Sequence, residues 1–422
     1  MRRVRSLIVA SCLSLIVAAG AATATATPAP PTGEPSPLAR TLQRLALPSP
    51  TGDPFFDVPQ ANLAALAPGR LIGPPRDVTQ VAQLKWFAPG IRASLLKFRT
   101  TDAFGRPSFG TATLLIPGTP WHGPRTRPML VDNFAIDSLG TTCTPSYRML
   151  HTDDADQLAV VEAPPVAVPA MLMRGYAVLV PDHEGPHMAY ADGHTAGPIV
   201  LDAIRAAYAA EPALRDATFA MVGYSGGAIA TGWADKMMAD YSPALLPRYA
   251  GSVLGGVPAD FDRLRYTMDG SLGTGLYTAA IVGLIRGRYP ELTQLASPDA
   301  EVAGNFARAI GLQNQCFLQL ASLGATFIPV RLFATLANPY VTPTAQYVLT
   351  DSKLAGSPLA GPLLLFNAAN DEWIPAAGTR ALYADQRDRG VNAQYVSVPG
   401  EHVMGAATGY PPAADWVISR LG

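Results

Sequence analysis

The chain has 422 residues, of which 49% are hydrophobic and 15% are charged. This length and composition are sufficient for one large domain or two ordinary ones with a sizeable core, which excludes disorder for the bulk of the chain. The formal net charge of −1, without a long run of like charges, provides no basic face and argues against a nucleic-acid partner. A small uncharged or apolar partner fits this composition better.

The first 26 residues have the organisation of a secretory signal peptide. A charged MRRVR precedes an apolar run, and small residues with A-x-A spacing follow it. We therefore expect a secreted protein that is cleaved near Ala24 or Ala26. A membrane anchor is the alternative, but the run is short and bounded by small and proline-rich sequence. A lipoprotein signal at Cys12 is a weaker alternative, because the apolar run continues past that cysteine.

Removal of the signal peptide leaves two cysteines, Cys143 and Cys316. Two remaining thiols in an oxidising compartment favour one disulfide, and two buried free thiols are the alternative. The segment that follows the signal peptide, residues 27–60, is rich in Pro, Thr and Ser. Its composition predicts an extended lead-in to the folded part.

Short apolar runs along the rest of the chain predict buried strands at 111–116, 129–134, 176–180, 219–223, 252–256, 362–366 and 393–398. Helix-like stretches lie between or after them at 197–209, 226–239, 376–389 and 411–421. Strands that alternate with helices favour an α/β fold with a mostly parallel sheet covered on both faces. Residues 258–345 break this alternation and predict an inserted helical cap, which divides the core into 61–257 and 346–422.

The sequence HEGPH at residues 183–187 has the spelling of a zinc-protease motif. That motif binds Zn²⁺ only when a helix brings both histidines onto one face. Pro186 lies between the histidines, and proline inside a helix removes a backbone donor and clashes with the preceding turn. Because the motif follows the predicted strand at 176–180, we interpret it as a loop and expect no metal there.

A second motif, GYSGG at residues 223–227, has the G-x-S-x-G pattern of a nucleophile elbow. It follows the predicted strand FAMV and precedes a helix-like stretch, which is the context that this chemistry requires. Glycines flank the serine because the sharp turn leaves no room for neighbouring side chains. We expect Ser225 to be the nucleophile, and a helix N-cap is the structural alternative.

The chain also supplies an acid and a base in the order that an α/β-hydrolase needs. Asp371 follows the predicted strand in PLLLF, and His402 follows the next one in AQYVSV. The order Ser225, Asp371, His402 is that of a Ser-Asp-His triad on this fold. Glu372 competes with Asp371 for the role of acid, and Asp371 could instead cap the helix that follows it.

With these residues in place, the chain resembles the secretory lipase family of the α/β-hydrolases. The resemblance is carried by FAIDSLGTTCTPSY (134–147), PDHEGPHMAYADG (181–193), GYSGGAIATGWA (223–234), ANDEWIP (369–375) and GEHV (401–404). These segments span most of the mature chain in the family's order. The family's fold is a hydrolase core with a helical cap inserted after the nucleophile, which agrees with the irregular segment at 258–345.

The resemblance implies roles for particular residues. Ser225, Asp371 and His402 fall on the family's triad. Asp137 and the backbone N–H of Gly226 fall on its oxyanion hole, although the alternative for Asp137 is a turn residue in DSLG. An aspartate donates to an oxyanion only when it is protonated, so burial and charge repulsion would have to raise its pKa. The resemblance also places Cys143 and Cys316 in a disulfide that ties the core to the cap.

The expected activity is hydrolysis of carboxylic esters, most readily of acylglycerols, through an acyl-enzyme intermediate and without a metal or cofactor. The partner is a lipid or other ester substrate, and the mature chain has no predicted membrane span. Alternatives on the same triad are a general esterase, an acyltransferase or an exported peptidase. A non-catalytic binding protein on a hydrolase scaffold is the alternative from another class.

Overall fold

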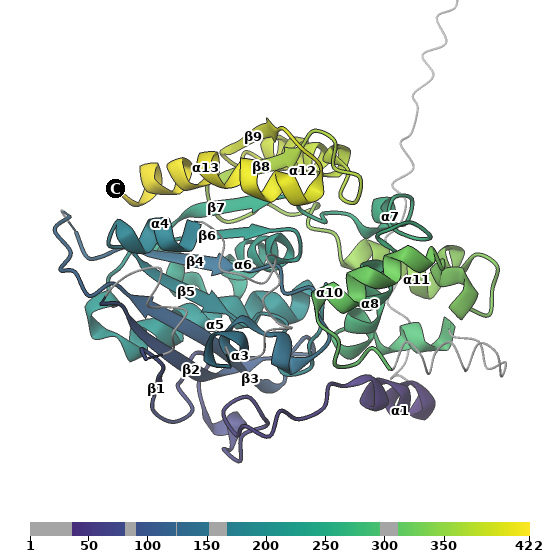
Figure 1. Ribbon diagram of the computed structural model, residues 1–422, viewed down its shortest axis with the longest axis horizontal. Coiled ribbons are helices and arrows are strands. Elements are labelled where there is room, and N and C mark those ends of the chain that lie inside the picture. Colours follow the sequence, from purple (N-terminus) through teal and green to yellow (C-terminus); the bar gives the residue numbers. More distant parts are fainter. Residues whose placement is uncertain (1–35, 81–89, 124, 152–166, 296–310) are drawn as a thin grey trace, which may run out of the picture.

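The computed structural model describes residues 36–80, 90–123, 125–151, 167–295 and 311–422. Within them one nine-stranded sheet has the order β1-β2-β3-β5-β4-β6-β7-β8-β9. The pairs β1–β2, β2–β3 and β3–β5 are antiparallel. The pairs β5–β4, β4–β6, β6–β7, β7–β8 and β8–β9 are parallel. The mostly parallel sheet expected from the sequence is confirmed (Figure 1).

Each of the seven predicted strands is present. They are β3 (Pro107–Ile116), β4 (Met129–Asn133), β5 (Ala177–Pro181), β6 (Phe219–Tyr224), β7 (Tyr249–Gly255), β8 (Leu363–Ala368) and β9 (Ala393–Val398). The strands β4, β5, β6 and β8 are buried along their whole length. Strands covered on both faces have near-continuous apolar sequences, which explains why the sequence revealed them.

Two strands were not predicted, β1 (Arg76–Asp77) and β2 (Arg92–Thr101). The sequence of β2, RASLLKFRTT, mixes cations with apolar residues and does not form an apolar run. Lys97 is nevertheless 6% exposed, because its ammonium group donates to the carbonyl oxygens of Pro54 at 2.9 Å and Asp57 at 2.6 Å. A buried lysine with such partners gives a strand a charged sequence without a solvent-facing side chain.

Helices cover both faces of the sheet. One face carries α5 (Gly193–Ala210), α6 (Gly226–Tyr241) and α12 (Ala376–Asp388), and the other carries α3 (Pro145–Leu150), α4 (Ala167–Met173) and α13 (His402–Leu421). Trp416 and Val417 of α13 belong to the same apolar cluster as Val222 and Val253 at the centre of the sheet. The last helix is thereby fixed on the strands that bear the candidate nucleophile.

Two expectations about local structure are wrong. The last helix begins at His402 and not at 411, because Glu401 caps it by accepting the backbone N–H groups of Val403 and Met404, and Pro411 and Pro412 lie inside it. The lead-in is not wholly extended, because it contains α1 (Pro37–Ala46), where Ser36 accepts the N–H of Ala39 and proline occupies the first turn. Local capping outweighs the composition in both places.

The segment between β7 and β8, called the cap below, contains helices joined by turns and loops where it is described. Its helices are α7 (Phe261–Leu264), α8 (Thr274–Arg286), α10 (Phe317–Ser322) and α11 (Pro343–Asp351). Short 3₁₀ turns in the described chain are η1 (Leu63–Ala65), η2 (Thr141–Cys143), η4 (Pro212–Leu214), η5 (Pro243–Arg248), η6 (Pro290–Leu295), η7 (Leu323–Thr326), η8 (Val330–Phe333) and η9 (Pro339–Val341). Figure 1 shows α8, α10 and α11 gathered at one side of the sheet. The domain boundaries at 258 and 345 remain a prediction.

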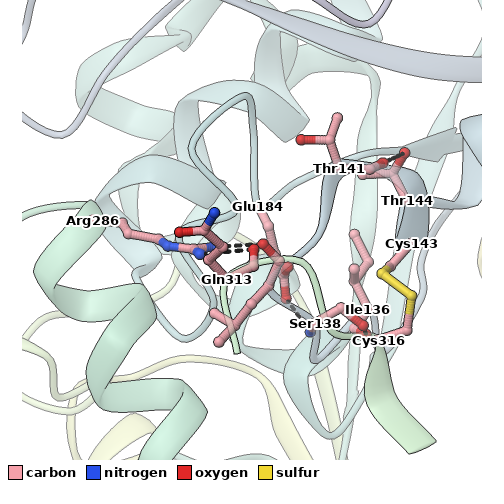
Figure 2. Close-up of a disulfide and its surroundings, with 10 residues drawn as sticks. Ile136, Ser138, Thr141, Cys143, Thr144, Glu184, Arg286, Gln313 and Cys316 are labelled. Atoms are coloured by element: carbon pink, nitrogen blue, oxygen red, sulfur yellow. Dashed lines mark hydrogen bonds between the residues drawn. A yellow bond between two sulfur atoms is a disulfide. The ribbon is translucent and has the colours of Figure 1, made fainter. Parts of the chain in front are cut away.

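A disulfide and a buried cation join the cap to the core. Cys143, after β4, is bonded to Cys316 at the start of α10, as the resemblance implied (Figure 2). Arg286 at the end of α8 is 1% exposed. Its guanidinium donates to the main-chain carbonyls of Ala46 at 2.6 Å in the lead-in, of Leu139 at 2.7 Å and Met188 at 3.2 Å in two core loops, and of Gln313 at 2.9 Å in the cap. The lead-in, two core loops and the cap therefore meet at one side chain.

The predicted signal peptide, its cleavage sites at Ala24 and Ala26, and Cys12 lie outside the described residues. Among the helices of the described ranges, none combines the length and apolar character needed to cross a bilayer.

Replacing Arg286 by Met should destabilise the fold. The variant keeps an apolar stem but leaves buried carbonyl oxygens without donors, which costs about 3 kcal/mol or more in the free energy of unfolding. Urea denaturation measures this loss. Arg92→Met is the matched control, because Arg92 is 62% exposed and pairs with Glu211 on the surface, so its loss should cost under about 1 kcal/mol. Equal losses of unfolding free energy in the two variants would contradict a stabilising role for the Arg286 hydrogen bonds.

Candidate active site

The turn between β6 and α6 holds Ser225 in a strained backbone conformation. Its φ is 53° and its ψ is −123°, a region that serine rarely occupies. Its neighbours leave no room for relaxation: a Cβ on Gly223 would lie 2.2 Å from the Gly227 carbonyl oxygen, and one on Gly227 would lie 1.9 Å from that of Asn133. The predicted strand–turn–helix context of the G-x-S-x-G motif is confirmed, and the hydroxyl lies at the carboxyl end of the parallel strands.

Two residues from later loops reach this hydroxyl. His402, the first residue of α13, places Nε2 3.0 Å from Ser225 Oγ and Nδ1 2.8 Å from Asp371 Oδ2. Both His402 and Asp371 are buried. Because the carboxylate accepts from Nδ1–H, the ring presents Nε2 to the serine as an acceptor. The structure thus brings together the three residues that the sequence placed in order.

The competing acid, Glu372, does not contact the imidazole ring. Its Oε2 instead accepts the backbone N–H of His402 at 3.3 Å. Asp371 is itself held in place, since its Oδ1 accepts the N–H groups of Ile374 at 2.8 Å and Trp373 at 3.2 Å. Tyr224, which the sequence reasoning missed, donates its hydroxyl to the His402 carbonyl at 2.5 Å. Tyr224 occupies the unspecified second position of the G-x-S-x-G motif, so the motif gave no indication of this contact.

Asp137 lies in the loop after β4, directly against the first residue of α6. Its backbone has a φ of 45°, its side chain is 2% exposed, and a Cβ on Gly226 would lie 1.7 Å from Asp137 Oδ1. That oxygen has no hydrogen-bond partner among the described residues. Burial raises the pKa of Asp137 to about 7. The arrangement provides a buried carboxyl that can hold a proton near neutral pH beside the start of a helix.

The PDHEG stretch after β5 braces the loop that carries Asp137. His183 donates from Nε2 to the carbonyl of Phe134 at 2.7 Å, which fixes its tautomer, and burial lowers its pKa to about 4. Asp182 accepts the N–H of Ser146 at 3.0 Å and the hydroxyl of Thr111 at 2.5 Å. The sequence predicted a loop here but could not identify these partners.

HEGPH itself forms turns and is not helical, so the interpretation as a loop is confirmed. The helical face that a zinc protease needs is absent at this position. Across the described ranges, no group of three or more His, Cys, Asp or Glu side chains is arranged to hold a metal ion.

A cavity of about 480 Å³ opens onto Ser225, Asp137 and His402. The rest of its lining is mainly apolar and comes from the cap as well as the core, including Leu276 of α8 and Phe317 of α10. An apolar cavity with a few convergent polar groups is the usual form of a small-molecule site.

The parallel sheet, the strained serine turn between a strand and a helix, and the helical insertion define an α/β-hydrolase. Within this class, the chain belongs to the secretory lipase family, whose model matches residues 155–422. The family assignment supports a hydrolase that acts on esters and an extracellular location.

Individual relatives and a solved structure agree with this assignment. A Mycobacterium tuberculosis protein named Probable inactive lipase is 30% identical over 90% of this chain and 84% of that protein. A Secreted triacylglycerol lipase of Malassezia furfur is 29% identical over 80% of this chain and 71% of that protein. The crystal structure of Candida antarctica lipase A has a TM-score of 0.77 at 26% identity, over 89% of this chain and 86% of that one.

The buried His183 makes a testable contribution to the pH dependence of stability. Because its pKa falls from an ordinary value of 6.5 to about 4 on folding, the unfolded state binds the extra proton first as the pH drops. Stability from this residue is complete above pH 6.5 and should decline by about 3 kcal/mol on acidification to pH 4. The difference in unfolding free energy between the native protein and His183→Gln, from denaturation at each pH, measures this. A difference that does not change with pH would show the assignment to be wrong.

Proposed function

We propose that this chain is a secreted carboxylic-ester hydrolase, acting as a triacylglycerol lipase through Ser225, His402 and Asp371. The observation that carries the proposal is the continuous hydrogen-bond chain from Ser225 Oγ to His402 Nε2 at 3.0 Å and from His402 Nδ1 to Asp371 Oδ2 at 2.8 Å. A nucleophile in contact with a base, and a base oriented by a third group, form the arrangement that activates a serine.

In the first half of the reaction, Ser225 Oγ attacks the ester carbonyl carbon while His402 Nε2 takes its proton. Asp371 stabilises the imidazolium that forms. The carbonyl oxygen becomes negative and is held by the N–H of Gly226 and by the protonated carboxyl of Asp137. His402 then returns its proton to the leaving alcohol. An acyl group remains on Ser225, and a water molecule activated by His402 removes it.

The character of the cavity favours a lipid over a charged substrate. Its walls include Leu264, Met268, Leu276 and Phe317, and apolar side chains of this kind provide no partners for the charges of a peptide. Among the relatives, the Malassezia furfur protein is named as a triacylglycerol lipase. An acylglycerol, with a neutral ester between an apolar chain and glycerol, matches both observations.

One relative bears the name of an inactive lipase, so a non-catalytic binding protein is the rival from another class. The two proposals differ in the reactivity of Ser225. A serine-directed phosphonate should label the native chain stoichiometrically at Ser225, whereas a binding protein would remain unlabelled.

We also propose that residues 1–26 direct export and that cleavage follows Ala24 or Ala26. The Cys143–Cys316 disulfide is consistent with an oxidising compartment, where such bonds persist. N-terminal sequencing of the secreted protein identifies the cleavage site.

Replacing Ser225 by Ala should reduce ester hydrolysis by a factor of about 10⁴ or more, because no other group can form the acyl-enzyme. The measurement is a p-nitrophenyl ester series from short to long acyl chains, with circular dichroism to show that the variant folds. Retention of more than a few per cent of activity by the folded variant would refute the nucleophile. An optimum restricted to short chains would indicate a general esterase in place of a lipase.

Asp137 should matter as a proton donor and not as a charge. Asp137→Ala removes one oxyanion donor and should lower kcat by about 100-fold or more. Asp137→Asn keeps a neutral donor and should retain more activity than Ala, with less dependence on alkaline pH. Steady-state kinetics with one ester across pH 5 to 9 compares the two variants. Complete inactivity of the Asn variant beside an unharmed Ala variant would contradict the role.

A further inference from the structure

The indole ring of Trp373 packs against the imidazole of His402, and the proposed mechanism gives it no task. Trp373 belongs to the loop between β8 and α12, two residues after Asp371, and it lines the catalytic cavity. The centres of the two rings are 5.4 Å apart and their planes meet at 41°. Aromatic side chains at such a separation attract one another. Trp373 therefore contacts the residue that the mechanism uses as its base.

The backbone of His402 is fixed by residues other than Trp373. Tyr224 donates its hydroxyl to the His402 carbonyl at 2.5 Å, and Glu372 Oε2 accepts the His402 N–H at 3.3 Å. The imidazole itself is attached to Asp371 by one hydrogen bond, from Nδ1 at 2.8 Å. One bond holds one corner of the ring, whereas the torsion χ2 of histidine has a broad energy minimum. The plane of the ring, and with it the direction of Nε2, depends on what packs against the ring.

Two aromatic rings pack against the imidazole. The ring of Tyr224 is centred 5.2 Å from it at an angle of 36°, and the ring of Trp373 is centred 5.4 Å from it. Tyr224 ends strand β6 and belongs to the apolar cluster at the centre of the sheet, so the sheet fixes its ring. Trp373 lies on a loop, and its ring requires support from outside the sheet.

The cap supplies this support. Trp373 packs against the apolar cluster that includes Leu264 and Met268 of the cap. Its carbonyl oxygen accepts the hydroxyl of Thr267, in the turn after α7, at 2.8 Å. The Leu264 carbonyl, within the same turn, is a more distant acceptor for that hydroxyl at 3.3 Å. The shorter contact of Thr267 thus crosses from the cap to the loop that carries Asp371.

The carboxyl of Asp371 does not depend on the indole ring. Its Oδ1 accepts the main-chain N–H groups of Ile374 at 2.8 Å and of Trp373 at 3.2 Å. Both donors remain when the side chain at position 373 is replaced by another that is not proline. The side chain of Trp373 therefore acts on His402 and not on Asp371.

We propose that Trp373 is a positioning residue for ester hydrolysis: its indole holds the imidazole of His402 with Nε2 toward Ser225 Oγ, and Thr267 of the cap holds Trp373 in place. This inference rests on the function proposed above for the triad. A displacement of about 1 Å between reacting groups can lower a rate about 100-fold, so the packing of one ring affects the rate. The cap thereby gains a contact with the acid–base side of the site.

Steady-state kinetics of Trp373→Leu and Trp373→Phe with p-nitrophenyl butyrate test the role of the ring. The Leu variant keeps an apolar wall and the main-chain groups, and its kcat should fall about 10-fold or more. Its KM should change by less than about threefold, because the lost contact is with the base and not with the substrate. The Phe variant restores an aromatic face and should recover most of the lost kcat. A raised KM with an unchanged kcat would refute the proposal.

Thr267→Val tests the support from the cap without altering the lining of the catalytic cavity, to which Thr267 does not belong. It removes one hydroxyl and keeps the shape, so kcat should fall about threefold with KM unchanged. Thr278→Val is the matched control, because the Thr278 hydroxyl donates to the Thr274 carbonyl within α8 at 2.8 Å, and its kcat should equal that of the native chain. A native kcat in Thr267→Val, or an equal loss in the control, would overturn the part assigned to the cap.

A crystal structure of Trp373→Leu follows the same geometry without turnover. The distance from His402 Nε2 to Ser225 Oγ is 3.0 Å in the native chain. In the variant it should exceed about 3.5 Å, beyond a hydrogen bond, or the imidazole should occupy a second rotamer. An imidazole in its native position would refute the proposal whether or not the native chain hydrolyses esters. A displaced imidazole in a chain without ester hydrolysis would support the positioning role and count against the proposed function alone.

Discussion

Ser225 has a positive φ that costs a serine about 1–3 kcal/mol, and the backbone around it is packed too tightly to let it relax. The strain is maintained by the central strands β6 and β7, where Ser225 N–H donates to the Gly255 carbonyl at 2.9 Å. The same sheet fixes Asp371 after β8 and His402 after β9. A mostly parallel sheet buried between helices can hold a strained turn at its edge because its strands cannot shift singly.

The other side of the site is assembled differently. Residues 134–140, which carry Asp137, form no helix or strand and are stabilised by contacts from distant segments. Leu139 N–H donates to the Gln315 carbonyl at 2.9 Å, its carbonyl accepts from Arg286, and Cys143 is bonded to Cys316. His183 of the PDHEG stretch donates a hydrogen bond to the Phe134 carbonyl of the same loop. The cap therefore forms part of the wall of the site and also fixes the loop that is proposed to stabilise the oxyanion.

The sequence predicted best what depends on local pattern and chain order. Ser225, Asp371 and His402 could be chosen because a parallel sheet brings successive strand ends to one edge, and the structure places them in contact. It failed where distant partners decide the outcome. The strand β2 was missed because Lys97 makes its sequence look exposed, while the burial of Lys97 depends on two carbonyls some 40 residues earlier. Arg286 likewise gave no indication in the sequence of its contacts with segments 98 to 240 residues away.

The hydrogen bonds of Arg286 to main-chain carbonyls affect how the sequence of this fold can change in evolution. Its acceptors are main-chain carbonyls, which every amino acid provides, so the side chains at Ala46, Leu139, Met188 and Gln313 can change without removing a hydrogen bond. A junction built on side-chain pairs would require matched substitutions at both partners. This one requires only that a single arginine and the path of the backbone persist, which leaves the surrounding residues free to drift while the core and the cap keep their relative placement.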